Sequence, residues 1–213
     1  MLTIRNETQA DRRIVEDITR RAFYNIYVPG CVEHYLVHTM RDHPDFIPEL
    51  DLVAELDGQV IGNVMYTRAS LTDEAGAVKE ILTFGPVAIA PEHQRKGWGR
   101  RLLEHSLRRA AELGWEAVVI FDSPVNYVGL GFQSCKRFNV RLEDGWFPSA
   151  MLVKELREGA LDGRGWVYQD SPVMSIDEEE ARRYDGTLEP MAREYRPSQE
   201  EFYIMSHSTV GEA

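Results

Sequence analysis

The sequence predicts an α/β fold built on a mixed sheet. Strand patterns at 52–56 and 60–68 flank Asp57-Gly58, a dipeptide typical of the tight turn of an antiparallel hairpin. A strand at 79–89, a helix at 97–113 and a strand at 117–121 follow in the order of a parallel crossover. A hairpin and a crossover together require a mixed sheet, and 213 residues that are 43% hydrophobic suffice for one sizeable core.

A strand and a helix open the chain. The strand is expected at 2–5, and Thr8 is positioned to cap a helix that runs to about residue 25. Ile14, Ile18 and Ala22 recur every four residues, which predicts that they share the buried face of this helix. The remaining elements of this part are expected as a helix over 32–41 and strands over 140–142 and 151–156.

The composition changes after about residue 158. Gly159, Gly163 and Gly165 lie close together, and an acidic helix over 177–184 follows, with Ser175 and Glu178 spaced as a capping box. We therefore divide the chain into a main domain at 1–158 and a C-terminal extension at 159–213 docked on it. The extension can cap a site, complete a sheet edge or form an interface, and the sequence does not choose among these roles.

Bulk properties argue against several classes of protein. The formal net charge of −11 disfavours a nucleic-acid partner; it suits a cationic partner such as an amine, although a solvated surface explains it equally well. No stretch approaches the roughly 20 apolar residues of a membrane span, and the first residues lack a signal-peptide pattern. Two cysteines, Cys31 and Cys135, make no disulfide framework, so we expect a cytoplasmic protein without a membrane partner.

A glycine-rich turn at 94–99 carries the strongest chemical signal. It follows an apolar strand and opens an amphipathic helix, whose free N–H groups and dipole suit a pyrophosphate. Basic and polar side chains surround this turn in an otherwise acidic chain: Gln94, Arg95, Lys96, Arg100 and Arg101. The P-loop pattern is absent, and Leu102 stands where a dinucleotide fingerprint needs its third glycine.

Gln94, Gly97 and Gly99 form a Gln-x-x-Gly-x-Gly pattern, which resembles motif A of the GNAT superfamily of N-acetyltransferases. The resemblance covers about residues 1–157 and is specific over 85–132. It implies a GNAT-type fold, with a mixed, mostly antiparallel central sheet flanked by helices and a splayed strand pair at the cofactor site. It also implies acetyl-CoA as co-substrate, with its pyrophosphate held by the backbone amides of the motif.

The strand before the glycine turn fits the same resemblance. Pro86 has no backbone N–H to donate to a neighbouring strand and is therefore expected at a bulge. GNAT proteins have a bulge in the equivalent strand, and it frees backbone groups to bind the pantetheine arm. A freed N–H near Ala88 is implied as the oxyanion hole. The cofactor-binding residues expected on this basis are Val87, Ala88, Ile89, Gln94, Arg95, Lys96, Gly97, Trp98, Gly99, Arg100 and Ser123.

Tyr127 is the expected catalytic residue. It stands before Gly131-Phe132, where many GNAT members have a tyrosine followed by Gly-Phe. The resemblance implies that Tyr127 is the general acid that protonates the leaving thiolate.

The acceptor half of the site is less defined by the sequence. Five residues are candidates for the base that deprotonates the amine: Glu33, His34, Glu80, His93 and Asp122. His34 and His38 are four apart, but the HExxH order is absent, so we expect no metal. No serine or cysteine has the setting of a nucleophile, which favours direct attack of the amine on acetyl-CoA.

These observations predict an acetyl-CoA-dependent N-acetyltransferase for a primary amine of a small molecule. Two alternatives stay open: acetylation of a protein or peptide amine, and a non-catalytic acyl-CoA-binding module. A pocket roofed by the C-terminal extension favours a small molecule, an open acidic groove favours a peptide, and a binding module has no turnover. A homodimer is left open as well.

Overall fold

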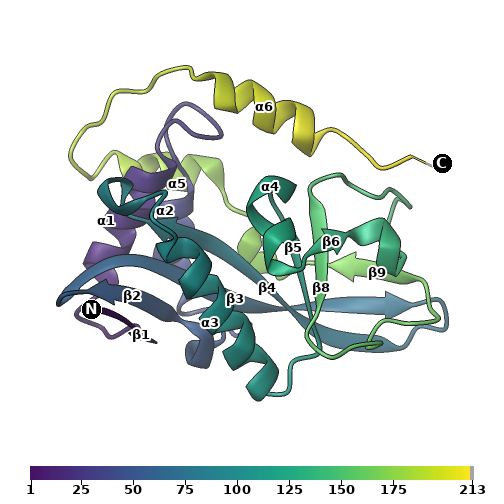
Figure 1. The fold of residues 1–213 in the computed structure, drawn as a ribbon. Coiled ribbons are helices and arrows are strands. Elements are labelled where there is room, and N and C mark those ends of the chain that lie inside the picture. Colours follow the sequence, from purple (N-terminus) through teal and green to yellow (C-terminus); the bar gives the residue numbers. More distant parts are fainter. Residues whose placement is uncertain (212–213) are drawn as a thin grey trace.

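One nine-stranded sheet forms the centre of the computed structural model, which describes residues 1–211 (Figure 1). Its strands are β1 Leu2–Asn6, β2 Leu52–Leu56, β3 Gln59–Asp73, β4 Val78–Ile89, β5 Ala117–Phe121, β6 Gln133–Ser134, β7 Val140–Arg141, β8 Met151–Glu155 and β9 Trp166–Gln169. The main path runs β1-β2-β3-β4-β5-β8-β6, while β9 pairs with the far half of β3 and with β7. Among the described strands, β4–β5 and β7–β9 are the parallel pairs, which confirms a mixed, mostly antiparallel sheet.

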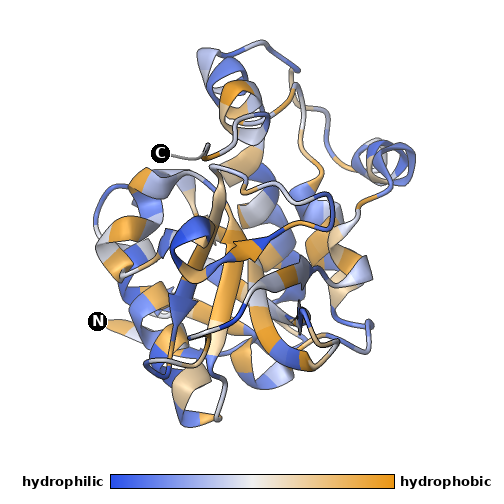
Figure 2. Cartoon of the chain, turned by 90° about the vertical axis from the view of Figure 1, so that its right-hand side faces the viewer, coloured by the Kyte–Doolittle hydropathy of each residue, from blue (hydrophilic) through white to orange (hydrophobic). Residues whose placement is uncertain are grey.

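Helices cover both faces of the sheet. The helices are α1 Arg12–Phe23, α2 Glu33–Met40, α3 Trp98–Glu112, α4 Pro124–Tyr127, α5 Glu178–Asp185 and α6 Pro197–Ser206, of which α1, α2 and α3 lie against the sheet. On one face α3 packs Leu103 and Leu107 into the core, and on the other α1 and α2 pack Val15 and Met40 against Met65. The strands between these helices carry the concentration of apolar residues seen in Figure 2. No helix within residues 1–211 has both the length and the hydrophobicity needed to cross a bilayer.

The turn between β2 and β3 confirms the predicted hairpin. Asp57 and Gly58 have φ values of 50° and 85°, both positive as a type I′ turn requires. β5 spans the predicted five residues. β3 is longer than predicted, because its second half, at 70–73, gains β9 as an additional partner.

The start of α1 differs from the expectation. Thr8 does not cap the helix; its N–H and its hydroxyl donate to the Asp11 carboxylate at 2.8 and 2.6 Å. Ile14 is 39% exposed, whereas Val15 and Ile18 are buried. The prediction for Ile14 was therefore wrong, because α1 turns the face with Val15 toward α2 and the sheet.

The segment after residue 158 adds β9 to the sheet and then wraps the helices. The N-cap of α5 is Asp177, whose carboxylate accepts hydrogen bonds from the N–H groups of Glu179 and Glu180. The predicted cap at Ser175 is therefore wrong. α6 is bound at both ends: the Ser198 hydroxyl donates to the Ile26 carbonyl at 2.9 Å, and the Ser149 N–H donates to the Ser208 carbonyl at 2.9 Å. A division at 158/159 stays a prediction.

Asn25 connects the α1–α2 loop to the C-terminal segment. Its amide donates to the Ala192 carbonyl at 2.9 Å, and its side-chain oxygen accepts the N–H of Glu194 at 3.1 Å. The side-chain amide of Gln199 donates a hydrogen bond to the backbone carbonyl of Asn25 at 3.1 Å. The path of the chain into α6 is thus fixed by a buried polar residue of the loop.

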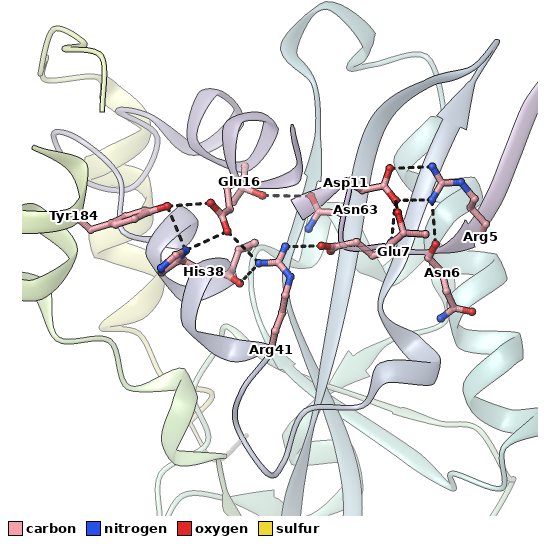
Figure 3. Close-up of polar contacts among 12 residues, drawn as sticks. Arg5, Asn6, Glu7, Asp11, Glu16, His38, Arg41, Asn63 and Tyr184 are labelled. Carbon is pink, nitrogen blue, oxygen red and sulfur yellow. Dashed lines mark hydrogen bonds and ion pairs between the residues drawn. The ribbon is translucent and has the colours of Figure 1, made fainter. Parts of the chain in front are cut away.

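A buried polar network joins β1, α1, α2 and α5 (Figure 3). Arg41 lies between Glu7 and Glu16, with ion pairs of 2.8 and 3.2 Å, and the Tyr184 hydroxyl donates to Glu16 at 2.9 Å. The side chains of Arg41 and Glu7 are only 4% and 2% exposed. The carboxyl of Asp51 lies near Glu7 in the same buried region, and burial raises the pKa of both groups, so we expect the pair to share one proton.

We expect the free energy of unfolding to fall as the pH becomes alkaline, and we expect Asp51→Asn to reduce this fall. Burial and the charge of Glu7 raise the pKa of Asp51 well above its usual value. The folded protein then holds a proton that the unfolded chain releases above about pH 4, so the free energy of unfolding falls as pH rises toward the folded-state pKa. The slope is at most about 1.4 kcal/mol per pH unit. Urea unfolding at pH 5 and pH 9 measures it, with exposed Asp42→Asn as the control; equal pH dependence in both variants would contradict the shared proton.

Candidate active site

β4 and β5 separate at the centre of the sheet. Their parallel pairing is a single position, Leu82 opposite Val118. β4 then continues to Ile89 paired with β3, whereas β5 ends at Phe121 paired with β8. Between Phe84 and Val87, β4 has one residue more than the facing part of β3, which is a β-bulge. This is the splayed pair that the fold prediction required.

The alternation of hydrogen-bonded and non-bonded residue pairs between β3 and β4 determines which N–H groups of β4 face the gap between β4 and β5. The Ala90 N–H donates to the Ile61 carbonyl at 2.8 Å. Bonded and non-bonded pairs alternate in an antiparallel ladder, so Ala88 is bonded to Asn63 on β3. The N–H groups of Val87 and Ile89 consequently point away from β3, toward the separated edge. The amide expected as the oxyanion donor near Ala88 is therefore not that of Ala88 itself.

The glycine turn begins α3. Gly97 is the N-cap residue and has a φ of 83°, a conformation that favours glycine. A Cβ on Gly99 would lie 3.4 Å from the Ile89 side chain, so α3 approaches β4 closely there. The Gln94 amide donates to the Ile89 carbonyl at 2.9 Å and thereby joins the loop to the end of β4.

The other expected cofactor residues lie around this turn or across the gap. The Lys96 ammonium donates to the Glu92 carbonyl at 2.8 Å, and the Arg100 guanidinium donates to Glu104 at 2.8 Å. Arg95 has a positive φ of 58°, and Ser123 directly precedes α4. The indole nitrogen of Trp98 is buried without a hydrogen-bond partner among the described residues. Binding by these residues stays a prediction.

Tyr127 lies at the end of α4, just beyond the carboxyl end of β5. Its hydroxyl donates to Asp122 at 3.1 Å, and its ring contacts Phe84 and Phe132 at centroid distances of 5.9 and 5.7 Å. Burial and the adjacent charge of Asp122 raise its pKa well above the usual value. Gly131, with a φ of 87°, turns the chain so that Phe132 packs under the tyrosine.

A cavity of about 310 Å³ opens between the separated strands and the helices. Residues of β4, β5 and α4 form one side, and residues of α1, α2 and their connection form a second. Three residues of the C-terminal segment, Asp170, Met174 and Phe202, form the third. These three residues were not predicted, because no local pattern in the sequence relates them to the glycine turn.

Two of the five candidate bases line this cavity, Glu33 and Asp122. Glu80 and His93 are absent from the described lining, and His34 is fully buried beside Asp185, where burial lowers its pKa to about 4.

Asp122 accepts the Tyr127 hydroxyl, so Glu33 is the carboxyl not bound to the tyrosine. Glu33 accepts the Val32 N–H at 3.0 Å and the Cys31 thiol at 3.2 Å, and burial raises its pKa. Within residues 1–211, no three His, Cys, Asp or Glu side chains are grouped as a metal site.

Comparisons with known proteins agree with this geometry. The family model of the acetyltransferase (GNAT) family matches residues 20–129. The uncharacterised N-acetyltransferase YhbS of Escherichia coli O157:H7 is 31% identical over 163 residues, which cover 76% of this chain and 92% of YhbS. The uncharacterised N-acetyltransferase YjhQ of Escherichia coli K12 is 29% identical over 128 residues, which cover 60% of this chain and 67% of YjhQ.

Two solved structures have the same fold. The crystal structure of YhbS from Escherichia coli in complex with CoA has a TM-score of 0.69 at 26% identity, covering 81% of this chain and 91% of that one. A GNAT family acetyltransferase from Brucella melitensis in complex with acetyl-CoA has a TM-score of 0.65 at 22% identity, covering 82% and 99%.

Proposed function

Because this chain belongs to the GNAT family of acetyltransferases, we propose that it transfers the acetyl group of acetyl-CoA directly to the primary amine of a small molecule. One observation carries the proposal. The separated end of β4 connects the glycine turn of α3 to a cavity that holds both Tyr127 and Glu33. A donor site and an acceptor site therefore meet at one strand edge.

The donor half rests on backbone groups. The N–H groups at the start of α3, after Gly97, suit the pyrophosphate of the co-substrate. Val87 lines the cavity and directs its N–H toward the gap, so this amide is the oxyanion donor. The N–H of Ile89 also points away from β3, and this group binds the pantetheine arm.

The acceptor half supplies the proton transfers. Glu33 takes one proton from the ammonium group of the acceptor, and the neutral nitrogen attacks the thioester carbonyl. The C–S bond breaks while Tyr127 gives its proton to sulfur, and the second nitrogen proton returns to the tyrosinate. The products are the amide, the CoA thiol and one proton on Glu33, which passes to solvent.

The C-terminal segment favours a small molecule over a peptide. Phe202 of α6 lies on the ring of Tyr27 at a centroid distance of 4.5 Å, and both residues line the cavity. Since hydrogen bonds hold both ends of the segment that contains α6, Phe202 stays over this part of the cavity, which favours a compact acceptor over an extended peptide.

We expect acetyl-CoA to raise the melting temperature of the protein and Gly97→Val to weaken that effect. A ligand that binds only the folded state stabilises it by mass action. Valine at a φ of 83° costs about 1–2 kcal/mol of backbone strain and moves the amides of the turn. Thermal shifts and binding isotherms with acetyl-CoA, CoA and ATP measure the affinities, and we expect at least a roughly tenfold loss, equal to about 1.4 kcal/mol.

Gly76→Val is the matched control for this variant. Gly76 has a φ of 82°, lies in the turn between β3 and β4, and has open space where a Cβ would stand, as at Gly97. It should lose stability without losing acetyl-CoA affinity. Equal binding of ATP, or equal loss of affinity in both variants, would contradict the donor site.

A further inference from the structure

The cavity lining is acidic without a balancing cation. Glu33, Asp122 and Asp170 contribute three carboxyl groups, and among the described lining residues there is no arginine, lysine or histidine. Carboxylates collected in one cavity repel one another and attract a cation. Burial raises the pKa of all three groups, so their charge is removed by protons or balanced by a cation on the molecule that binds.

The three carboxyl groups lie at different depths. The charges of Glu33 and Asp122 both act on Tyr27, which lines the cavity with them. Asp170 follows β9 and accepts the Ser171 N–H at 2.8 Å; it is the most exposed residue of the three, although burial of its carboxyl still raises its pKa. Glu33 and Asp122 are thus the less exposed pair, and Asp170 is the lining carboxyl nearest to solvent.

The walls between these groups are apolar. Phe23 and Tyr27 have ring centroids 5.8 Å apart, and Phe202 covers Tyr27 from the C-terminal segment. Met174 lines the same cavity. A hydrocarbon chain fits these walls, whereas a polar middle section would lose its hydrogen bonds with water there.

We propose that the acceptor is a diamine, with one amino group at Glu33 for acetylation, a hydrocarbon body between the aromatic walls, and a second ammonium group at Asp170. This rests on the proposed function and names its substrate class. Asp122 is already bound to Tyr127, so Asp170 is the carboxylate free for the second cation. The same lining disfavours amino acids, because their carboxylate enters a cavity that already holds three carboxyl groups.

Three acceptors of one chain length test the proposal. Lysine is 1,5-diaminopentane with an added carboxylate, and pentylamine is 1,5-diaminopentane without its second ammonium group. With acetyl-CoA and the full-length protein, we expect kcat/KM for the diamine to exceed that for lysine by at least roughly tenfold. We expect it to exceed that for pentylamine by about 2- to 5-fold, as for an exposed ion pair.

Asp170→Asn locates the second ammonium group. The variant should lower kcat/KM for 1,5-diaminopentane to the value for pentylamine measured with the same variant, so that the preference between the two amines is lost. Asp162→Asn is the control, because Asp162 is exposed in the same segment and lies outside the cavity lining. It should retain the preference.

The outcomes separate this inference from the proposed function. Lysine acetylated as fast as the diamine, or a preference that survives in Asp170→Asn, would overturn the diamine proposal and leave the acetyltransferase intact. Acetyl-CoA binding without turnover of any of the three amines would overturn both the small-amine assignment and the diamine. Turnover of pentylamine alone would overturn the role of Asp170.

Discussion

Tyr127→Phe is expected to lower kcat by about 100- to 10,000-fold, the range for the loss of a general acid. The ring stays packed against Phe84 and Phe132, so only the hydroxyl and its bond to Asp122 disappear. Acetyl-CoA affinity should remain, because the glycine turn and the β4 amides are untouched. Single-turnover kinetics, in which the chemical step limits the rate, together with a binding isotherm, separate the two effects.

Tyr66→Phe is the matched control. Tyr66 is also buried, and its hydroxyl shares a hydrogen bond of 2.7 Å with Ser106 of α3, outside the cavity lining. This variant should lose stability and retain its turnover.

Asp122→Asn adds a readout from pH. Besides burial, the charge of Asp122 raises the pKa of Tyr127. Replacing this carboxylate by the neutral asparagine amide should therefore lower the pKa of Tyr127, so that the tyrosine loses its proton at a lower pH and activity falls earlier on the alkaline side. Full turnover in Tyr127→Phe, or an alkaline limb unmoved in Asp122→Asn, would contradict the assignment of the acid.

Local signals in the sequence were sufficient for much of the fold. The positive φ values of Asp57 and Gly58 follow from a two-residue turn between apolar strands, and that of Gly97 from a glycine placed before a helix. Such conformations depend on a few adjacent residues. The β5 strand was predictable for the same reason, since it is a short apolar run between turn residues.

Features set by distant partners were not predictable. Ile14 has the spacing of a buried residue, yet the packing of α1 on α2 selects the neighbouring Val15. The direction of the Ala88 amide depends on which β3 residue faces Ala90, and a shift of one position would reverse it.

The third wall of the cavity depends on contacts over a still longer range. Asp170 reaches it because β9 joins β3, and Phe202 because α6 is held by Asn25 and Ile26, more than 160 residues earlier in the chain. Periodicity and turn signals contain no information on such pairings. The donor half of the site is therefore readable from motifs, whereas the acceptor half requires the folded chain.

Glu33→Gln is expected to lower kcat/KM for an amine by about 100-fold or more at pH 7. Glutamine can still accept the Val32 N–H and the Cys31 thiol, so α2 should begin as before. What disappears is the less exposed of the two lining carboxyl groups that do not bind Tyr127, Glu33 and Asp170. Because burial raises the pKa of Glu33, its carboxylate is a stronger base than an exposed glutamate.

The pH dependence distinguishes this role from a structural one. Without the base, the variant must use the fraction of amine that is already neutral in solution, and this fraction rises tenfold per pH unit up to the pKa of the amine, about 10. The gap between wild type and Glu33→Gln should therefore close as pH increases, whereas a distorted site would keep a constant gap. Asp51→Asn, which changes another buried carboxyl group outside the cavity, should show no gap at any pH where it is folded. A constant deficit in Glu33→Gln would overturn the role of Glu33 as the base and leave water, Asp122 or Asp170 as the proton acceptor in the cavity.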